Sequence, residues 1–260
     1  MKLKIALAQI DIAFGQPTVN FAKVEDFIAR ASGKVDVIVF PEMWNTGYAL
    51  SELTELSDKE GKFTQNLLAR LAKKYQINCV GGSVSTQKAE KFYNTSYIFD
   101  TSGNLVSTYD KVHLFGPMNE EKFIAAGNRE NQFELAGVPS ASVICYDIRF
   151  PEWLRTNMSQ GAKILYVVAE WPVQRVRQWK ILLQARAIEN QAFVVAVNRV
   201  GSDLNNQFNG HSLIISPLGE IIVNAGENET LCFAEIDLSE IDSVRGEIPV
   251  FSDRRPELYH

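Results

Sequence analysis

Val35-Asp36-Val37-Ile38-Val39-Phe40-Pro41-Glu42 holds the clearest structural signal in this chain. Its first six residues are apolar except for Asp36. A half-exposed strand alternates apolar and polar residues, whereas a nearly continuous apolar run is typical of a strand buried on both faces. Such a strand needs a layer of other elements on each side, so this segment predicts a layered α/β architecture.

Short β-branched runs alternate with helical patterns on both sides of this segment. The pattern at 19–31 places Phe21, Val24, Phe27 and Ile28 on one helical face. The predicted strands are numerous enough to form one large sheet or two. Strands are predicted at 4–9, 35–40, 78–84, 96–100, 143–145, 164–169, 193–198, 212–216, 221–224 and 232–236, and helices at 19–31, 60–75, 151–160 and 173–191.

Length and composition describe an ordinary globular protein. The chain has 260 residues, of which 46% are hydrophobic and 22% charged, and it has no linker or repeat, so residues 1–260 are predicted to form one domain. Residues 245–260 are predicted to form an extended polar C-terminal tail that packs on something, such as a second subunit. The net charge of −5 has the wrong sign for binding phosphate backbones, so nucleic acid is not expected as a partner.

Cysteine and histidine usage indicates a reducing setting without a metal site. The three cysteines are odd in number and far apart, which argues against a disulfide framework and against a paired-cysteine metal site. The apolar run at the N-terminus is too short for a signal peptide, and no segment has the length of a membrane span. We therefore expect a soluble cytoplasmic protein with no metal and no membrane contact. The residues concerned are Cys79, Cys145, Cys232, His113, His211 and His260.

Glu42 is the first candidate for chemistry because it directly follows the buried strand 35–40. Open α/β sheets bind ligands at the carboxyl ends of their strands, and burial beside Met43 and Trp44 would raise the pKa of a carboxyl group. Such a residue suits a general base. The alternative is an ordinary glutamate of a surface loop.

Lys111 and Cys145 also follow strand patterns. A lysine alone is most often solvated. Cys145 precedes a helix that Pro151 would start well, so the strand-to-helix turn would expose its thiol as a nucleophile elbow does. A core position, as expected for Cys79 and Cys232, is otherwise the commoner place for a cysteine.

Taken together, these segments resemble the nitrilase superfamily of carbon–nitrogen hydrolases. The resemblance covers residues 5–253 and rests on the order Glu42, Lys111, Cys145. The segments 145–152 and 170–172 look most like its omega-amidase branch, which hydrolyses the terminal amide of 2-oxo acids such as 2-oxoglutaramate. Further matches are Gly81-Gly82-Ser83, Glu120 ahead of Ala126-Gly127, Ala187-Ile188-Glu189-Asn190 and Gly210-His211-Ser212.

This resemblance implies a four-layer α-β-β-α sandwich, with two central mixed sheets flanked by helices, that commonly forms a homodimer. It implies that Glu42 deprotonates Cys145 and that the thiolate attacks the amide carbonyl. Lys111 and the backbone N–H of Tyr146 would stabilise the oxyanion, and no cofactor is implied. Glu120, seven residues before the motif glycine, is expected to be the second glutamate of the family, with the adjacent Glu121 as the alternative.

A 2-oxo acid amide carries a carboxylate, and burying that charge requires a cation. Arg175 follows a strand end and lies in the first turn of a predicted helix, so we expect it to bind the carboxylate. Tyr48 and Trp171 complete the expected substrate-binding set. Arg149 is the alternative candidate for binding the carboxylate, although it is expected to brace the Cys145 turn through Asp147 or Glu152. Glu170 is expected to turn away from the substrate or to pair with Arg175.

Other functions remain open at this level. The chain could be an aliphatic amidase, a carbamoyl-amide hydrolase or a nitrilase, or a binding protein that has lost catalysis. The presence of all three catalytic residue types argues against the last alternative. His113 is expected to be structural rather than half of a Cys/His dyad, and Ser212 lacks the glycine pattern of a serine nucleophile.

Overall fold

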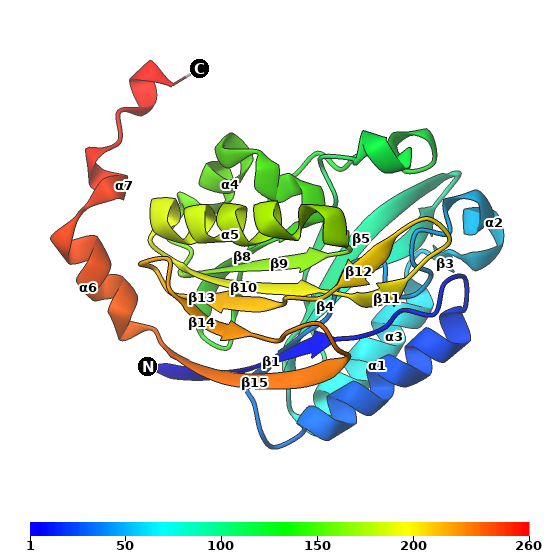
Figure 1. The fold of residues 1–260 in the computed structure, drawn as a ribbon. Helices are drawn as coiled ribbons and strands as arrows, with labels where there is room; N and C mark the ends of the chain where they lie inside the picture. Colours follow the sequence, from blue (N-terminus) through cyan, green and yellow to red (C-terminus); the bar gives the residue numbers. More distant parts are fainter. Residues whose placement is uncertain (260) are drawn as a thin grey trace.

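Two mixed β-sheets lie face to face at the centre of the computed structural model, which describes residues 1–259 (Figure 1). Two long helices, α1 and α3, cover the outer face of the first sheet, while α4 and α5 cover the outer face of the second. The predicted four-layer α-β-β-α sandwich is confirmed. The helices are α1 (Pro17–Ala31), α2 (Leu53–Leu56), α3 (Lys62–Tyr75), α4 (Pro151–Met158), α5 (Val176–Asn190), α6 (Ser239–Glu247) and α7 (Val250–Asp253).

The first sheet has the strand order β15-β1-β2-β4-β5-β6, with β3 paired to β4. Strands β1, β2 and β4 run parallel to one another, and the remaining pairs on this path are antiparallel. The strands are β1 (Lys2–Gln9), β2 (Val37–Val39), β3 (Asp58–Lys59), β4 (Asn78–Lys88), β5 (Lys91–Phe99), β6 (Leu105–Asp110) and β15 (Thr230–Asp237).

The second sheet has the strand order β14-β13-β10-β9-β8-β7, in which β8, β9 and β10 are parallel. A separate hairpin joins β11 and β12. The strands are β7 (Gln132–Leu135), β8 (Val138–Ile144), β9 (Ile164–Ala169), β10 (Phe193–Asn198), β11 (Val200–Ser202), β12 (Gln207–Asn209), β13 (Leu213–Ile215) and β14 (Ile221–Asn224).

Both faces of the inner strands are buried, as the apolar runs predict. On β1, Ile5 and Leu7 join the core between the sheets, while Ala6 and Ala8 join the core under α1 and α3. This alternation follows from the two-residue period of a strand. Apolar side chains therefore fill the space between the sheets and the space under the helices on both outer faces.

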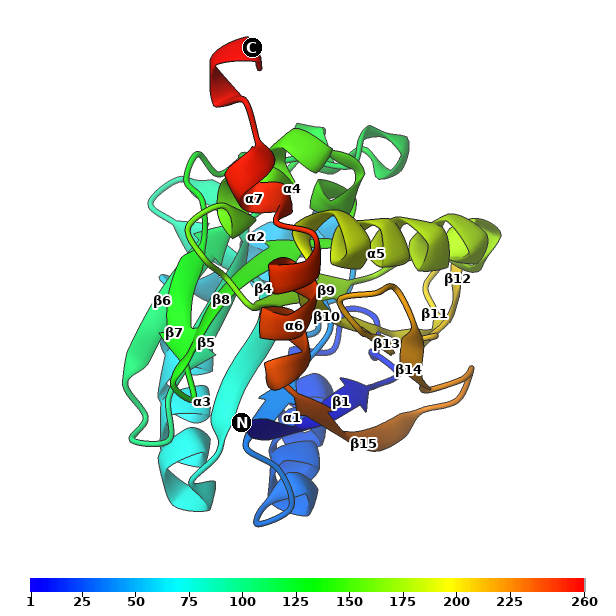
Figure 2. The same ribbon diagram turned by 90° about the vertical axis from the view of Figure 1, so that its left-hand side faces the viewer.

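Every predicted strand and helix is present: β9, β10 and β14 have the predicted bounds, the other elements have shifted ends, and short elements escaped prediction. The predicted extended tail 245–260 is partly helical: α6 ends at Glu247, and α7 and a 3-10 turn at Pro256–Leu258 follow. Arg245 anchors its start by donating to the carbonyl oxygen of Ala162 at 2.7 Å, and Figure 2 shows the segment continuing past α4. His260 lies outside the described residues. Within residues 1–259, no helix is long and apolar enough to cross a membrane.

Candidate active site

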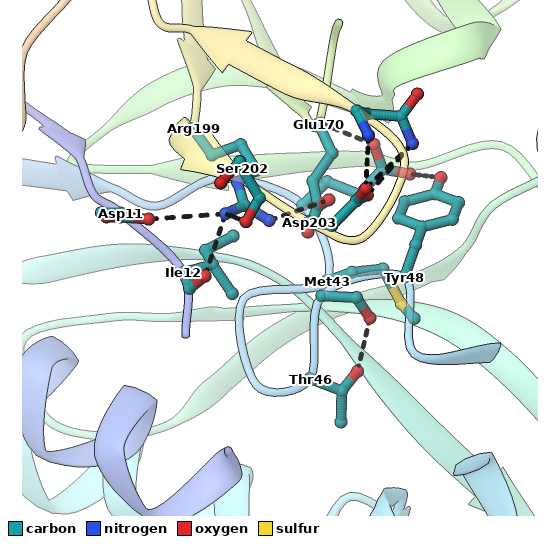
Figure 3. A network of polar contacts seen from close by, with 12 residues as sticks. Asp11, Ile12, Met43, Thr46, Tyr48, Glu170, Arg199, Ser202 and Asp203 are labelled. Carbon is teal, nitrogen blue, oxygen red and sulfur yellow. Dashed lines mark hydrogen bonds and ion pairs between the residues drawn. The ribbon is translucent and has the colours of Figure 1, made fainter. Parts of the chain in front are cut away.

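A buried polar cluster is built from residues at the ends of strands from both sheets. Lys111 directly follows β6, Cys145 follows β8, Glu170 follows β9, and Arg199 follows β10. Glu42 lies three residues beyond β2. These strand ends meet between the sheets, where the backbone turns away from the ladder and side chains are free to converge. Figure 3 shows the part of this region around Glu170, Arg199 and Tyr48.

Lys111 lies at the centre of the cluster. Its Nζ donates to Oε1 of Glu42 at 2.7 Å, to Oε2 of Glu120 at 2.8 Å and to the hydroxyl of Tyr48 at 3.0 Å. These contacts use all three donors of an ammonium group. The Lys111, Glu42 and Glu120 side chains have no exposed surface, so their ion pairs lie in a dry environment. The structure therefore brings together three of the predicted residues and rules out solvated positions for them.

Glu42 is held by four hydrogen-bond donors. Its Oε1 also accepts from Tyr48 at 2.7 Å and from Asn94 at 2.8 Å, and its Oε2 accepts the backbone N–H of Glu170 at 2.8 Å. Burial by itself would raise the pKa of Glu42, but the Lys111 charge and these hydrogen bonds outweigh it and lower that pKa. Glu42 is therefore an ionised carboxylate that is held in one orientation.

The second glutamate is Glu120 in position, not Glu121. Besides its contact with Lys111, Oε2 of Glu120 accepts the backbone N–H of Phe115 at 2.7 Å, and Oε1 accepts from Asn94 at 3.2 Å. Glu120 is buried, whereas Glu121 is exposed. The position of Glu120 fits the choice made from the spacing to the motif glycine, and its role stays a prediction.

Cys145 occupies a sharp turn between β8 and α4. Its φ of 47° is left-handed, a conformation that is strained for a residue with a side chain. Its Sγ lies 4.0 Å from the carbonyl oxygen of Glu170. Burial, followed by the negative charge of Glu42, raises the pKa of the Cys145 thiol well above its usual value, while Lys111 opposes this rise. The thiol is therefore protonated at rest and needs a base before it can attack.

Asp147 braces the Cys145 turn. It accepts from Tyr109 at 2.8 Å, from the backbone N–H groups of His113 and Ile144 at 3.0 Å, and pairs with Nδ1 of His113 at 2.8 Å. The His113 ring also stacks on Phe150 with centroids 3.8 Å apart. These contacts fit the structural role that was expected of His113. Within residues 1–259, no group of three His, Cys, Asp or Glu side chains is placed to hold a metal ion.

A small pocket opens on Cys145. Arg149 was expected to brace the turn, but its guanidinium lies 5.0 Å above the Trp171 ring, because Asp147 is already occupied by other donors. Arg175 lies 5.5 Å above the Phe115 ring. Two cations therefore border one small pocket. It is lined by Tyr48, Phe115, Cys145, Tyr146, Arg149, Glu170, Trp171, Pro172 and Arg175.

Glu170 departs from its expected role. Its side chain is fully buried, and its Oε2 lies 3.4 Å from Nη1 of Arg199, so it pairs with Arg199 rather than with Arg175. Arg199 follows the neighbouring parallel strand β10, which places the two side chains in the same layer. Sequence reasoning missed Arg199 and Asn94. The strand-end position that identifies Glu42 and Cys145 was the available signal for Arg199.

Residues 4–246 match the carbon-nitrogen hydrolase family. The chain belongs to this family. A relative of this carbon-nitrogen hydrolase, the 2-oxoglutaramate amidase of Bacillus subtilis, is 48% identical over 259 residues and covers 100% of both chains. An omega-amidase of Saccharomyces cerevisiae is 30% identical over 277 residues and covers 99% of this chain and 95% of its own.

Solved structures agree with this assignment. The nitrilase-superfamily protein Nit3 of Saccharomyces cerevisiae superimposes with a TM-score of 0.90 at 29% identity, covering 98% of this chain and 97% of its own. A hydrolase-superfamily protein of Xanthomonas campestris, solved with an arsenic adduct in its active site, gives a TM-score of 0.93 at 29% identity and 98% coverage of both chains. The resemblance to the nitrilase superfamily is confirmed, and the chain is a hydrolase of carbon–nitrogen bonds other than peptide bonds.

Proposed function

We propose that this carbon-nitrogen hydrolase converts 2-oxoglutaramate to 2-oxoglutarate and ammonia through a thioester on Cys145. The observation that carries the proposal is the pocket in which two guanidinium groups, Arg149 and Arg175, border a buried thiol. Full-length similarity to a 2-oxoglutaramate amidase supports the same substrate. The substrate's carboxylate and its amide would then occupy opposite ends of one pocket.

The first half of the reaction forms the thioester. Glu42 takes the thiol proton, and the thiolate sulfur forms a bond to the amide carbon while the carbonyl electron pair moves to oxygen. Lys111 and the backbone N–H of Tyr146 stabilise this oxyanion. The donors of Lys111 are all in use at rest, and its contact with Tyr48 is the longest of the three, so we propose that the oxyanion replaces this contact.

The second half releases both products. Protonated Glu42 returns its proton to the amide nitrogen, the C–N bond breaks with its electron pair moving to nitrogen, and ammonia leaves. Glu42 then takes a proton from water as the water oxygen attacks the thioester carbon. The C–S bond breaks, and the sulfur recovers the proton as a thiol. Glu42 is held by four donors, which supports its use as the base in both halves.

The two arginines give the proposed substrate its anchor. A carboxylate loses its hydration in a small pocket and needs a cation in return. A guanidinium offers two parallel N–H groups that match a carboxylate, and aromatic rings beneath Arg149 and Arg175 hold both planes in place. These contacts favour an anionic amide over the uncharged substrates of an aliphatic amidase or a nitrilase.

An amide screen with ammonia release as its readout tests the proposal. We expect 2-oxoglutaramate to be hydrolysed with a kcat/KM well above that of uncharged amides of similar length, and mass spectrometry to detect 2-oxoglutarate. Preferred hydrolysis of uncharged amides, nitriles or carbamoyl compounds would instead support another branch of the superfamily. Complete absence of hydrolysis would support the binding-protein alternative.

We also propose that the enzyme forms a homodimer. Ile181 and Ile188 are more than half exposed on α5, and Ile248, Leu258 and Tyr259 are exposed on the C-terminal segment that runs past this layer (Figure 2). Burying such side chains against a second copy is favourable. Sedimentation is expected to give a dimer at micromolar concentration, and a monomer there would contradict this proposal.

We place the reaction in the cytoplasm. Within the described chain, Cys79, Cys145 and Cys232 are free thiols, and the proposed chemistry requires the thiol of Cys145. Reducing compartments preserve thiols. Cell fractionation that found the protein outside the cytoplasm would contradict this location.

A further inference from the structure

Glu170 is held beside the reacting groups although the mechanism above gives its side chain no task. Its backbone N–H donates to Glu42 at 2.8 Å, and its carbonyl oxygen lies 4.0 Å from Sγ of Cys145. Glu170 is one of the residues that line the pocket opening on Cys145, and its side chain is fully buried. In Figure 3 it is drawn between Arg199 and Tyr48. Glu170 therefore belongs to the wall of the pocket, with its carboxyl group buried behind that wall beside Arg199.

The two oxygens of this carboxyl group have different surroundings. Oε2 lies 3.4 Å from Nη1 of Arg199, whereas Oε1 is buried and has no hydrogen-bond partner within residues 1–259. Arg199 also donates to the carbonyl oxygens of Ile12 at 2.9 Å and Val200 at 3.0 Å, and lies 3.5 Å from Asp11. Its charge is thus shared among several acceptors. One oxygen of Glu170 therefore has unused hydrogen-bonding capacity.

The surroundings favour the neutral form of this carboxyl group. Burial, against the opposing charge of Arg199, raises the pKa of Glu170 to about 8, and the negative charges of Glu42 and Asp203 contribute. A guanidinium can only donate hydrogen bonds, so Oε2 must accept and the proton resides on Oε1. The other titratable or charged groups at this pocket are Cys145, Tyr48, Lys111, Arg149 and Arg175.

We propose that Glu170 is a specificity-determining residue whose neutral carboxyl group donates a hydrogen bond from Oε1 to the 2-oxo oxygen of the substrate. The inference rests on the proposed function. Lys111 and Tyr146 are assigned to the amide oxygen and the arginines to the carboxylate, so the 2-oxo oxygen is the remaining polar group of the substrate. Two other donors near the pocket are already in use. The indole N–H of Trp171 donates to the carbonyl oxygen of Arg175, and the hydroxyl of Tyr48 donates to Oε1 of Glu42.

This contact distinguishes substrates by what they place opposite Oε1. A keto oxygen accepts the Glu170 proton, whereas a methylene group leaves the buried carboxyl group unpaired, a situation that binding sites discriminate against strongly. Ionised Glu170 would lose the donor and would add a negative charge facing an anionic substrate. Selectivity for the 2-oxo group should therefore disappear as Glu170 loses its proton.

The experiment compares kcat/KM for 2-oxoglutaramate and for glutaramate, which has the same chain without the 2-oxo oxygen. Wild type is expected to prefer 2-oxoglutaramate, and Glu170→Leu to reduce that preference roughly tenfold or more. Glu170→Gln should retain it, because Arg199 holds the amide oxygen at the Oε2 position and leaves an N–H donor at the Oε1 position. Glu121→Gln, at an exposed glutamate, is the matched control and should behave as wild type.

The pH dependence of the same ratio gives a second readout. Between pH 7 and pH 9 the wild-type preference for 2-oxoglutaramate should fall, whereas that of Glu170→Gln should stay constant. Taking the ratio cancels the ionisation of groups that act on both substrates, such as Cys145. This arm still tests the inference if Glu170→Leu does not fold.

Three outcomes would overturn the inference: an absent preference in wild type, an unchanged preference in folded Glu170→Leu, or the same alkaline fall in Glu170→Gln. In each of these cases wild type still hydrolyses 2-oxoglutaramate, so the proposed function survives. If wild type hydrolysed neither amide, the proposed function would be overturned, and this inference with it.

Discussion

The ammonium nitrogen of Lys111 lies 2.7 Å from Oε1 of Glu42, and neither side chain has any exposed surface. Glu120 lies 2.8 Å from the same nitrogen, so one cation serves two buried carboxyl groups. Breaking a buried ion pair by removing one partner typically costs about 3–5 kcal/mol, because the other charge stays buried and unpaired. Stability and catalysis are therefore coupled at this cluster.

Lys111→Met is expected to lower kcat by roughly 100- to 1,000-fold or more, because the lost charge stabilises an oxyanion that exists only in the transition state. The same change should lower the free energy of unfolding by about 3–5 kcal/mol. Steady-state kinetics and urea unfolding measure the two effects. Lys122→Met, at an exposed lysine of the same loop region, is the control. An effect confined to KM would reassign Lys111 to substrate binding.

Glu42→Gln is expected to abolish both formation and hydrolysis of the thioester. The amide keeps the shape of the side chain, but it cannot accept the proton of a thiol whose pKa is raised by burial. Rapid-quench mass spectrometry after mixing with 2-oxoglutaramate should find no acylated protein. Acylation at the wild-type rate would mean that another group deprotonates Cys145.

Arg175→Ala is expected to weaken hydrolysis of 2-oxoglutaramate by at least tenfold, and hydrolysis of an uncharged amide of similar length far less. Arg149→Ala should give the same pattern, since both guanidinium groups border the pocket. Arg177→Ala, at an exposed arginine of α5, is the control and should not discriminate between the two amides. Equal losses on both substrates would place the carboxylate elsewhere.

Glu170 should also leave a signature in protein stability. Its pKa is raised from about 4.5 to about 8 in the folded chain, so above pH 4.5 the unfolded chain releases a proton that the folded chain keeps. Stability contributed by this group therefore falls between pH 4.5 and pH 8 and is constant above. The unfolding free energy of Glu170→Gln minus that of wild type should increase over this range. A difference independent of pH would contradict a neutral Glu170.

The long buried elements were predictable, and the polar partners inside the site were not. Continuous apolar runs identify β2, β9 and β10, because burial on both faces leaves no place for polar residues. The hairpin β11–β12 and the strand β7 have mixed polarity, so neither a continuous apolar run nor a period identifies them.

In the site, too, some features were predictable from the sequence and others were not. Strand-end position and motif resemblance led to Glu42 and Cys145, which follow buried strands. Pairing within the site depends on the register of neighbouring strands. The register of β9 and β10 places Glu170 beside Arg199, although Arg175 is nearer in the sequence. A single sequence does not specify that register, so of the two expected alternatives for Glu170 the pair with Arg175 was wrong.

Acylation of Cys145 is the central claim, and intact-protein mass spectrometry tests it most directly. Wild-type enzyme mixed with 2-oxoglutaramate and quenched in acid should carry one acyl group, located on the peptide that contains Cys145, while ammonia and 2-oxoglutarate form in equal amounts. Cys145→Ala and Cys145→Ser should stay folded, carry no acyl group and release no ammonia, whereas Cys232→Ser should behave as wild type. Ammonia release by a Cys145 variant, or an acyl group on another residue, would contradict the account.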